Sequence, residues 1–355
     1  MINVNKKLIN IIIVFVGVLV IGCVSGLSSS SENNQESDDL LLQLKGYIII
    51  DRPGTSAIEL PSNKQVVIRK YGVDALGGPD SQGRIAFIDS DLGAKTYSLK
   101  VIDVVTKKET EVFTRQGSYW PHEKENYGKS FSFSQDGGLV AFVKNYKNDF
   151  SLMPDDYVGI GHLEIVNAEK RNTIKTDIQV LDKGLNWFPG GKKLVYVAVM
   201  PRDKVRHDLV EKFEDGFGSE MMTWHSTPVV VMLNLKDMST KQLHIGWNPI
   251  VSKDGSSILI QDYKGRIRMY KVSSGNSMPV NVPIGEQCHV FSFIGKDIIL
   301  YKTIPDTDRK YRLTSTLGTT PYWTLRVAQI NTSKYKTIVQ HLDIHRRVSY
   351  GEVRK

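Results

Sequence analysis

A short hairpin unit recurs along this chain and constrains its fold more than any other feature. The unit is clearest at residues 131–142 (FSFSQDGGLVAF), and it returns at 185–196 and 249–260. Weaker copies occupy residues 290–301 and 79–87. In the clearest copies a β-rich segment runs into Asp-Gly or Gly-Gly, which fits a two-residue turn, and a continuous apolar segment follows. Each unit therefore predicts a β-hairpin whose second strand is buried on both faces.

The spacing of the units predicts the number of blades in a β-propeller. Each copy is followed by further β-rich segments, and four antiparallel strands per repeat are typical of a propeller blade. The turn glycines are 54, 54, 64 and 40 residues apart, at Gly83, Gly137, Gly191, Gly255 and Gly295. A bare blade needs about 40 residues, so three intervals carry insertions. The sequence predicts an all-β fold with six four-stranded blades, and seven blades are the alternative.

A sixth blade requires one strand from each end of the chain. Residues 46–50 (GYIII) have the pattern of a second strand, but no first strand precedes them. Residues 56–60 and 65–68 supply the later strands of the same blade. We predict that residues 347–353 (RVSYGEV) provide the missing inner strand. Pairing of the N- and C-terminal strands would close the ring and remove open sheet edges.

The hairpin unit resembles the repeat of the TolB-like β-propellers, which also occurs in the propeller domain of prolyl oligopeptidases. The resemblance covers most of residues 45–353. It implies the fold, while propellers of this type bind proteins, sugars or peptides, or shield an enzyme. The chain departs from TolB because no separate α/β domain fits before the first blade. A prolyl oligopeptidase also needs a Gly-x-Ser-x-Gly motif. The most similar segment, residues 275–279 (GNSMP), lacks the last glycine.

The first residues have the layout of a secretory signal. Lys6 and Lys7 precede a run of 14 residues, 8–21, that is almost wholly apolar. At about 1.5 Å per helical residue this run is too short to span a bilayer comfortably. It ends at residues 20–23 (VIGC), which resemble the lipobox of bacterial lipoproteins. The resemblance implies cleavage before Cys23 and acylation of that cysteine, for example with palmitate, and the alternative is an uncleaved anchor helix.

The segment after Cys23 is predicted to be a tether. Residues 25–39 (SGLSSSSENNQESDD) are polar and contain no aromatic residue, so they cannot bury enough apolar surface to fold alone. The expected organisation is a signal peptide at 1–22, a lipidated cysteine and flexible tether at 23–39, and a propeller domain at 40–355. The protein would then be held in the bacterial cell envelope by its lipid, with the folded domain outside the cytoplasm.

The net charge limits the classes of partner, and the cysteine content bears on disulfide bonds. The net charge is +8, and loss of the two signal lysines would leave +6. The basic residues do not alternate with aromatics as a nucleic-acid groove requires, so we expect no nucleic-acid partner. We interpret the modest excess of positive charge as solvated surface residues. The alternative is that it attracts an anionic envelope polymer or lipid surface. If Cys23 is lipidated, Cys288 has no cysteine partner, and no intrachain disulfide is expected.

The insertions are the candidate binding sites, because binding residues favour loops on a rigid scaffold. Their aromatic residues could stack on sugars or anchor a protein, although such residues also serve as blade core. The candidate ligand- or partner-binding residues are Trp120, Phe150, Trp224, His225 and Tyr322. In the longest insertion, 200–224, the spacing of Val205, Leu209 and Phe213 predicts one short amphipathic helix with Asp203 as a cap. That helix would either pack on the propeller rim or be offered to a partner.

Two functional hypotheses remain. The eight histidines are scattered, and neither His-Glu-x-x-His nor cysteine pairs with metal spacing occur, so we predict no catalytic residue, metal or cofactor. The preferred hypothesis is a monomeric, membrane-tethered, non-catalytic binding or scaffold module for a protein or a glycan. The alternative is a propeller enzyme, a metal-assisted lyase or hydrolase, acting on envelope or extracellular carbohydrate.

Overall fold

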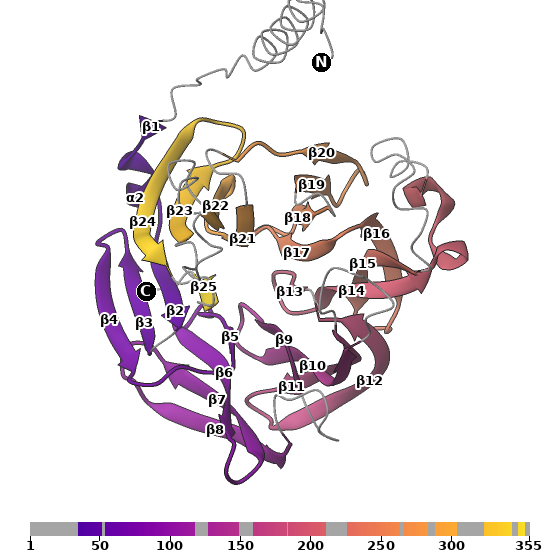
Figure 1. Ribbon diagram of the computed structural model, residues 1–355, viewed down its shortest axis with the longest axis horizontal. Helices are drawn as coiled ribbons and strands as arrows, with labels where there is room; N and C mark the ends of the chain where they lie inside the picture. The colour runs from indigo at the N-terminus through magenta and orange to yellow at the C-terminus, as the bar shows by residue number, and fades with distance from the viewer. Residues whose placement is uncertain are drawn as a thin grey trace, which may run out of the picture. The chain divides into compact units, whose positions relative to one another are not determined.

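The computed structural model describes residues 35–51, 54–117, 127–148, 159–182, 184–210, 226–262, 266–282, 288–303, 323–342 and 347–351. The chain divides into two units, Met1–Asn34 and Gln35–Lys355. The second unit consists of six sheets arranged as the blades of a propeller (Figure 1). Each has four antiparallel strands, and one gains a fifth, parallel strand at its outer edge. The prediction of an all-β fold is confirmed, with six blades rather than seven.

Each blade runs from an innermost to an outermost strand, and we number the blades in chain order. Blade 1 consists of β25 (Arg347–Gly351), β2 (Gly46–Asp51), β3 (Thr55–Leu60) and β4 (Lys64–Arg69). Blade 2 consists of β5 (Ala75–Gly77), β6 (Arg84–Asp91), β7 (Thr96–Asp103) and β8 (Glu109–Gln116). Blade 3 consists of β9 (Tyr127–Phe133), β10 (Leu139–Asn148), β11 (Gly159–Asn167) and β12 (Asn172–Leu181).

The second half follows the same order. Blade 4 consists of β13 (Leu185–Trp187), β14 (Lys193–Pro201), β15 (Ser226–Asn234) and β16 (Thr240–Ile245). Blade 5 consists of β17 (Trp247–Val251), β18 (Ser257–Gln261), β19 (Ile267–Lys271) and β20 (Ser277–Pro279). Blade 6 consists of β21 (Cys288–Phe293), β22 (Ile298–Thr303), β23 (Trp323–Gln329) and β24 (Lys334–Leu342).

The C-terminal strand closes the ring, as the sequence predicts. Each innermost strand contacts the innermost strand of the next blade, and β25 contacts both β21 of blade 6 and β5 of blade 2. β25 also pairs with β2 in antiparallel register, with Ile49 opposite Ser349. Blade 1 is therefore the blade whose strands come from both ends of the chain, and its pairing leaves no open inner edge.

A second closure comes from the segment just before blade 1. Strand β1 (Gln35–Glu36) pairs in parallel with β24 on the outer edge of blade 6. Helix α2 (Asp39–Leu42) follows, and its buried Leu40 joins a core cluster with side chains of blades 6 and 1. The sequence predicts a tether that extends to residue 39, whereas residues 35–39 belong to the described fold. Their polarity was misleading because an edge strand is held by backbone hydrogen bonds and needs no apolar side chains.

The repeated hairpins differ from the predicted turn in length. Ser134 N donates to Leu139 O at 2.8 Å, and Gly137 N donates to Ser134 O at 2.9 Å, so four residues separate the last paired positions. The expectation of a two-residue turn is therefore wrong. The Ser134 hydroxyl donates to Asp136 Oδ1 at 2.5 Å and accepts from Leu139 N at 2.9 Å. Side chains thus supply bonds that a tighter turn would make through the backbone.

A recurring backbone bond places two turns of every such blade at the same end. The residue after the third strand donates its N–H to a carbonyl of the turn between the first and second strands. The pairs are Val104 to Gly83, Ala168 to Gly138, Leu235 to Lys192, Val272 to Ser256, and Ile330 to Asp297, at 2.8–3.0 Å. We call this end of the propeller, formed by the short turns that bear Gly83, Gly137, Gly191, Gly255 and Gly295, the turn face.

The equivalent turn of blade 5 carries a pH-dependent contact. Hydrogen bonds from Ser252 and Ser256 lower the pKa of Asp254 to about 2. The native state therefore favours the charged form, and this contribution is present above the unfolded pKa near 4 and is lost as the pH falls towards 2. We expect the melting temperature of the wild type to fall more steeply between pH 4 and pH 2 than that of Asp254→Asn. Parallel pH curves for the two proteins, measured by calorimetry, would contradict this assignment.

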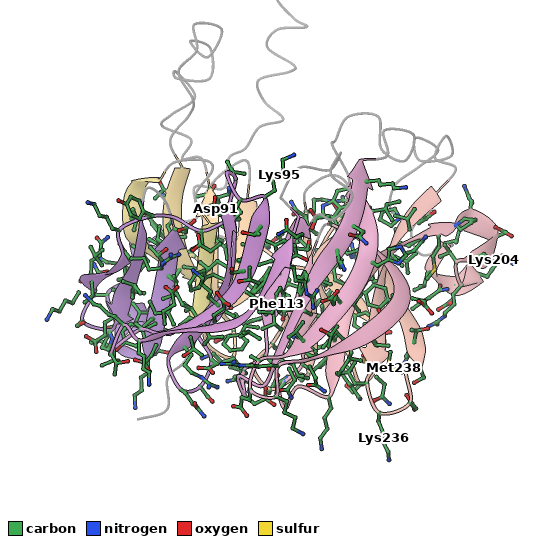
Figure 2. All side chains as sticks on the ribbon, turned by 90° about the horizontal axis from the view of Figure 1, so that it is seen from below. Asp91, Lys95, Phe113, Lys204, Lys236 and Met238 are labelled. Atoms are coloured by element: carbon green, nitrogen blue, oxygen red, sulfur yellow. The ribbon has the colours of Figure 1, made fainter. Side chains whose placement is uncertain are left out.

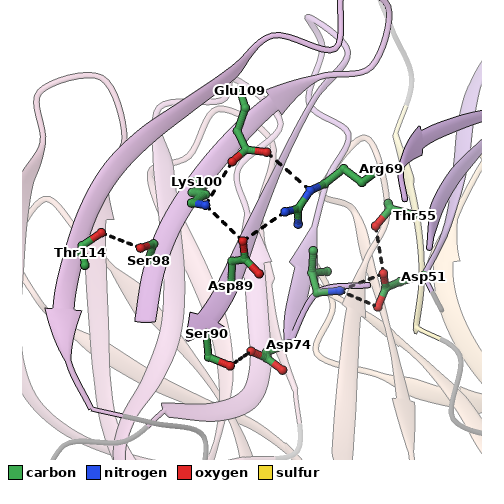
Figure 3. A network of polar contacts seen from close by, with 11 residues as sticks. Asp51, Thr55, Arg69, Asp74, Asp89, Ser90, Ser98, Lys100, Glu109 and Thr114 are labelled. Atoms are coloured by element: carbon green, nitrogen blue, oxygen red, sulfur yellow. Dashed lines mark hydrogen bonds and ion pairs between the residues drawn. The ribbon is translucent and has the colours of Figure 1, made fainter. Parts of the chain in front are cut away.

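Ion pairs join the outer parts of neighbouring blades. Arg69, at the end of β4, reaches Asp89 of blade 2 at 3.1 Å and Glu109 at 3.5 Å (Figure 3). Lys100 bridges the same two acids at 3.1 and 3.2 Å. Burial lowers the pKa of Lys100, but its bonds to Asp89 and Glu109 outweigh burial and leave the pKa raised. The Arg69 guanidinium also lies 4.5 Å from the ring centre of Phe87. These contacts fix blade 1 against blade 2.

Candidate binding face

The long connections all leave the propeller at the end opposite the turn face. Each of them joins the second strand of a blade to the third, or the last strand of one blade to the first strand of the next. Because neighbouring strands are antiparallel, both kinds of connection lie at the same end of the propeller. The four longest gaps between described residues are 118–126, 149–158, 211–225 and 304–322. We call this end the insertion face. In Figure 2 its labelled residues are Asp91 and Lys95, and Lys236 and Met238 mark the opposite face.

The predicted site residues lie within these connections. Trp120, Phe150, Trp224, His225 and Tyr322 are outside the described residues, and so is Cys23. What the structure describes is the strand ends that flank the four connections, and these ends share the insertion face. The assignment of the five residues to a binding site stays a prediction.

The first part of the longest insertion packs against the propeller. A 3₁₀ helix spans Arg202–Lys204, and α-helical residues follow at 207–210. Val205 and Leu209 are 7% and 8% exposed and lie in the core cluster shared by blades 3 and 4. Packing on the rim is therefore confirmed for these two residues, and Phe213 lies outside the described part. Asp203 is wrong as a helix cap, because it lies inside the 3₁₀ helix, whose N-cap is Pro201.

Polar contacts hold this insertion to the outermost strand of blade 4. Arg206 N donates to Gln242 Oε1 at 2.8 Å, and Arg206 Nη1 donates to Gln242 O at 3.1 Å. Gln242 Nε2 returns a bond to Lys204 O at 2.9 Å. Asp208 holds the guanidinium through two further bonds, at 2.9 and 2.6 Å. The insertion thus covers part of the edge of β16, which would otherwise present unpaired backbone groups.

Carboxylates position other backbone segments of the insertion face. Asp51, fully buried, accepts from Val73 N at 3.1 Å and from the Thr55 hydroxyl at 2.9 Å (Figure 3). Asp262, 1% exposed, accepts from Arg266 N at 3.0 Å and Arg266 Nε at 2.8 Å. These bonds tie the connection before β5 and the one after β18 to their blades. A partner would therefore meet a face whose scaffold is held in place before binding.

Two exposed apolar side chains on this face were missed by sequence reasoning. Tyr71 is 70% exposed and lies in the connection between β4 and β5, and Leu92 is 63% exposed in the turn between β6 and β7. Neither lies in a long insertion, so the insertion pattern of the sequence does not point to them. The sequence feature that could have indicated them is a large apolar residue within a turn that is rich in Gly, Asp and Ser. On the turn face, Val105 and Met238 are also exposed, at 69% and 42%.

The described part of the chain was examined for metal-ligating groups and for membrane-spanning helices. No group of three or more His, Cys, Asp or Glu residues in that part is placed to hold a metal ion. Among the described helices, none is long and apolar enough to cross a membrane. The insertion face offers aromatic and aliphatic contacts on a fixed scaffold, which are suited to binding.

Comparisons with solved structures place this architecture among known propellers. TolB from Acinetobacter baumannii matches with a TM-score of 0.54 at 12% identity, over 86% of this chain and 67% of that chain. A chain of a nidogen/laminin complex matches with a TM-score of 0.51 at 8% identity, over 85% and 96%. A putative TolB from Agrobacterium tumefaciens matches with a TM-score of 0.50 at 11% identity, over 84% and 90%. The chain thus has a TolB-like six-bladed propeller fold.

Sequence comparisons add nothing to this fold-level likeness. No family model matches the chain. No curated protein matches it either. At identities of 8–12% the structural likeness establishes the fold alone.

Proposed function

We propose that this chain is a lipid-anchored protein of the bacterial envelope whose propeller binds a protein or glycan partner through the insertion face. The observation that carries the proposal is the asymmetry between the two faces. The turn face consists of short turns closed by recurring backbone hydrogen bonds. The long connections leave from the insertion face. A protein surface that varies on one face of a rigid scaffold is the usual arrangement of a binding module.

A protein partner is favoured by two further points. Exposed aromatic and apolar side chains are the residues that most often anchor protein interfaces. The nidogen/laminin complex contains a propeller chain of similar fold, which supports protein binding by this architecture. A glycan would use the same aromatic side chains by stacking, so the partner's class is an outcome of the experiment.

The two faces can be compared directly with matched variants. We expect Tyr71→Ala with Leu92→Ala to weaken binding of a partner recovered from solubilised membranes by about tenfold, the effect of losing about 1.4 kcal/mol at an interface. The control, Val105→Ala with Met238→Ala, removes two apolar residues that are 69% and 42% exposed on the turn face and should leave the dissociation constant unchanged. Titration by isothermal calorimetry measures both. If only the turn-face pair weakens binding, the proposal has the wrong face.

The insertions themselves are tested by Phe150→Ala and Trp224→Ala. If they contact the partner, the dissociation constant rises while the melting temperature holds. If they pack on the propeller instead, each substitution lowers stability by about 3–5 kcal/mol, as for a buried aromatic residue. A melting curve and a binding titration on the same samples separate the two results.

The lipid anchor is tested by mass spectrometry. We expect the mature protein to begin at an acylated Cys23 and to fractionate with membranes. The Cys23→Ser variant should be recovered without lipid. A mature chain that retains Met1 would overturn the proposed lipid anchor but would not affect the proposed binding face.

Metal analysis of the same preparation tests the alternative that the protein is an enzyme. A stoichiometric transition metal would support that alternative.

A further inference from the structure

Each of the six turns between a third and a fourth strand contains a residue with a left-handed backbone. In blades 1, 5 and 6 this residue is an asparagine or a glycine, which adopt the conformation readily. In blades 2, 3 and 4 it is Lys107, Arg171 and Met238, with φ angles of +59°, +54° and +58°. These three turns keep long side chains where asparagine or glycine would be less strained, which indicates that the side chains have a role.

The three turns lie side by side on the turn face, because blades 2, 3 and 4 are neighbours (Figure 1). Together with adjacent residues they present six exposed side chains that are basic or apolar. We call these the basic-apolar surface, and they are Val105, Lys107, Lys108, Arg171, Lys236 and Met238. Figure 2 shows Lys236 and Met238 at the edge of the molecule opposite Lys95. Each apolar member lies two residues from a lysine, so apolar tips and positive charge share one surface.

The acids of the same turns are engaged by neighbouring groups. Asp103 accepts from two backbone N–H groups of its own turn, at 3.0 and 2.6 Å. Asp237 accepts from the N–H and the hydroxyl of Ser239, at 3.0 and 2.7 Å. Glu169 lies 3.7 Å from Arg84. The basic members of the surface, in contrast, form no ion pair with a described residue. Their charge is therefore presented to solvent, where it attracts anionic groups.

The chain enters the propeller at this same end. Strand β24 begins at the turn face, because Ile330 in the turn before it donates to Asp297 O. Gln35 lies opposite Lys334, the first residue of β24, and β1 runs parallel to that strand. From Cys23 to Gln35 the chain can extend at most about 40 Å, and the nine residues of β24 alone span about 30 Å. A membrane at Cys23 is thus within reach of the turn face at any extension, whereas the insertion face would reach it only if the propeller turned over.

We propose that the turn face docks on an anionic lipid surface through the basic-apolar surface, and this proposal rests on the lipid anchor proposed for Cys23. The basic side chains would lie at the level of the lipid headgroups, and Val105 and Met238 would enter the boundary with the acyl chains. The short link to the anchor raises the local concentration of this face at the membrane, so that individually weak contacts suffice. The insertion face would then point away from the membrane, open to its partner.

Lysine labelling on vesicles tests this docking. The mature lipidated protein is added to preformed vesicles of phosphatidylcholine, alone or mixed with phosphatidylglycerol. An uncharged, membrane-impermeant amine reagent is applied, and mass spectrometry measures the reaction rate of each lysine. We expect Lys107 and Lys236 to react about threefold or more slowly on the anionic vesicles than on the neutral ones, while Lys95 and Lys204 of the insertion face react equally on both. High salt, which screens the attraction, should abolish the difference.

Charge reversal assigns the contact to particular side chains. The variant Lys107→Glu with Lys236→Glu should remove the protection of Lys192, another exposed lysine of the turn face. The matched control, Lys95→Glu with Lys204→Glu, changes the net charge equally on the insertion face and should leave Lys192 protected on anionic vesicles.

The outcomes separate the docking from the anchor. Equal rates for the turn-face lysines, in a protein that floats with both kinds of vesicle, would overturn the docking and leave the anchor in place. A protein that floats only with anionic vesicles, with the same lysines protected, would overturn the anchor and support the docking, and one that floats with neither would overturn both. Protection of Lys95 and Lys204 instead would place the wrong face on lipid. Protection of the turn face by soluble dextran sulfate but not by anionic vesicles would assign it to an anionic polymer and overturn the proposal.

Discussion

Removal of residues 347–355 is expected to abolish the cooperative unfolding transition of the propeller. The deletion removes β25, which pairs with β2 over five residues and contacts the innermost strands of both neighbouring blades. Each lost backbone hydrogen bond costs about 1 kcal/mol net. The fully buried Ile48 and Ile49 would also lose cover on the exposed edge of β2. The sum is comparable with the whole stability of a typical domain, about 5–15 kcal/mol.

The matched control removes residues 352–355 alone, which leaves β25 whole. This shorter truncation should keep the parent melting temperature, whereas the longer one should give a broad, weakly cooperative transition. Calorimetry and near-ultraviolet circular dichroism report both properties. If the protein without residues 347–355 melts at the parent temperature, the ring is held by the contacts of β1 and α2, and β25 is dispensable.

The closing strand shows which features of this fold were predictable from sequence. The second-strand pattern at residues 46–50, with no first strand before it, required a partner from elsewhere in the chain, and Arg347–Gly351 supplied it. The repeated hairpins were equally visible because a buried strand after a glycine turn leaves a local pattern. Burial of the second strands follows that pattern, as in β14, where five consecutive residues are buried.

Features that depend on two distant segments were not predictable. The pairing of β1 with β24 joins residues about 300 positions apart. Nothing in the polar sequence of Gln35 and Glu36 indicates this pairing. The exposure of Tyr71 and Leu92 depends on which face each turn occupies. Arg326 reads as an ordinary basic residue in a strand, and its near-complete burial depends on how blade 6 packs against blade 5. Local periodicity carries no information on such contacts.

The turn glycines combine both kinds of information. Gly137, Gly191 and Gly255 each follow an aspartate or a glycine, which indicates a backbone with positive φ, and Gly137 has a φ of +73°. Their second role appears when the blades are assembled, because three of them touch the turn of the preceding blade. A Cβ at Gly137 would lie 2.0 Å from Asp80 Oδ2, one at Gly191 would lie 2.9 Å from Asp136 Oδ2, and one at Gly255 would lie 3.3 Å from Phe188. The turn face is therefore a ring of close contacts between successive blades.

Gly137→Ala should consequently cost more than backbone strain alone. Asp80 is fully buried, and its carboxylate accepts from Gln82 N at 2.9 Å, Arg84 N at 2.8 Å and Arg84 Nε at 2.9 Å. It cannot withdraw from the new methyl group without breaking some of these bonds. We expect a loss of about 3 kcal/mol, of which about 1 kcal/mol is the strain of a left-handed alanine.

Gly190→Ala is the matched control, because Gly190 has a φ of +80° and a Cβ there would meet nothing within 4 Å. That variant carries the backbone strain without the collision and should lose about 1 kcal/mol. Urea denaturation of both variants measures the difference in the free energy of unfolding. Equal losses would show that Asp80 and Arg84 move aside freely, and that the repeated glycines serve the conformation of each turn alone. A larger loss in Gly137→Ala would show that the same residue shapes the turn and sets the distance between blades 2 and 3.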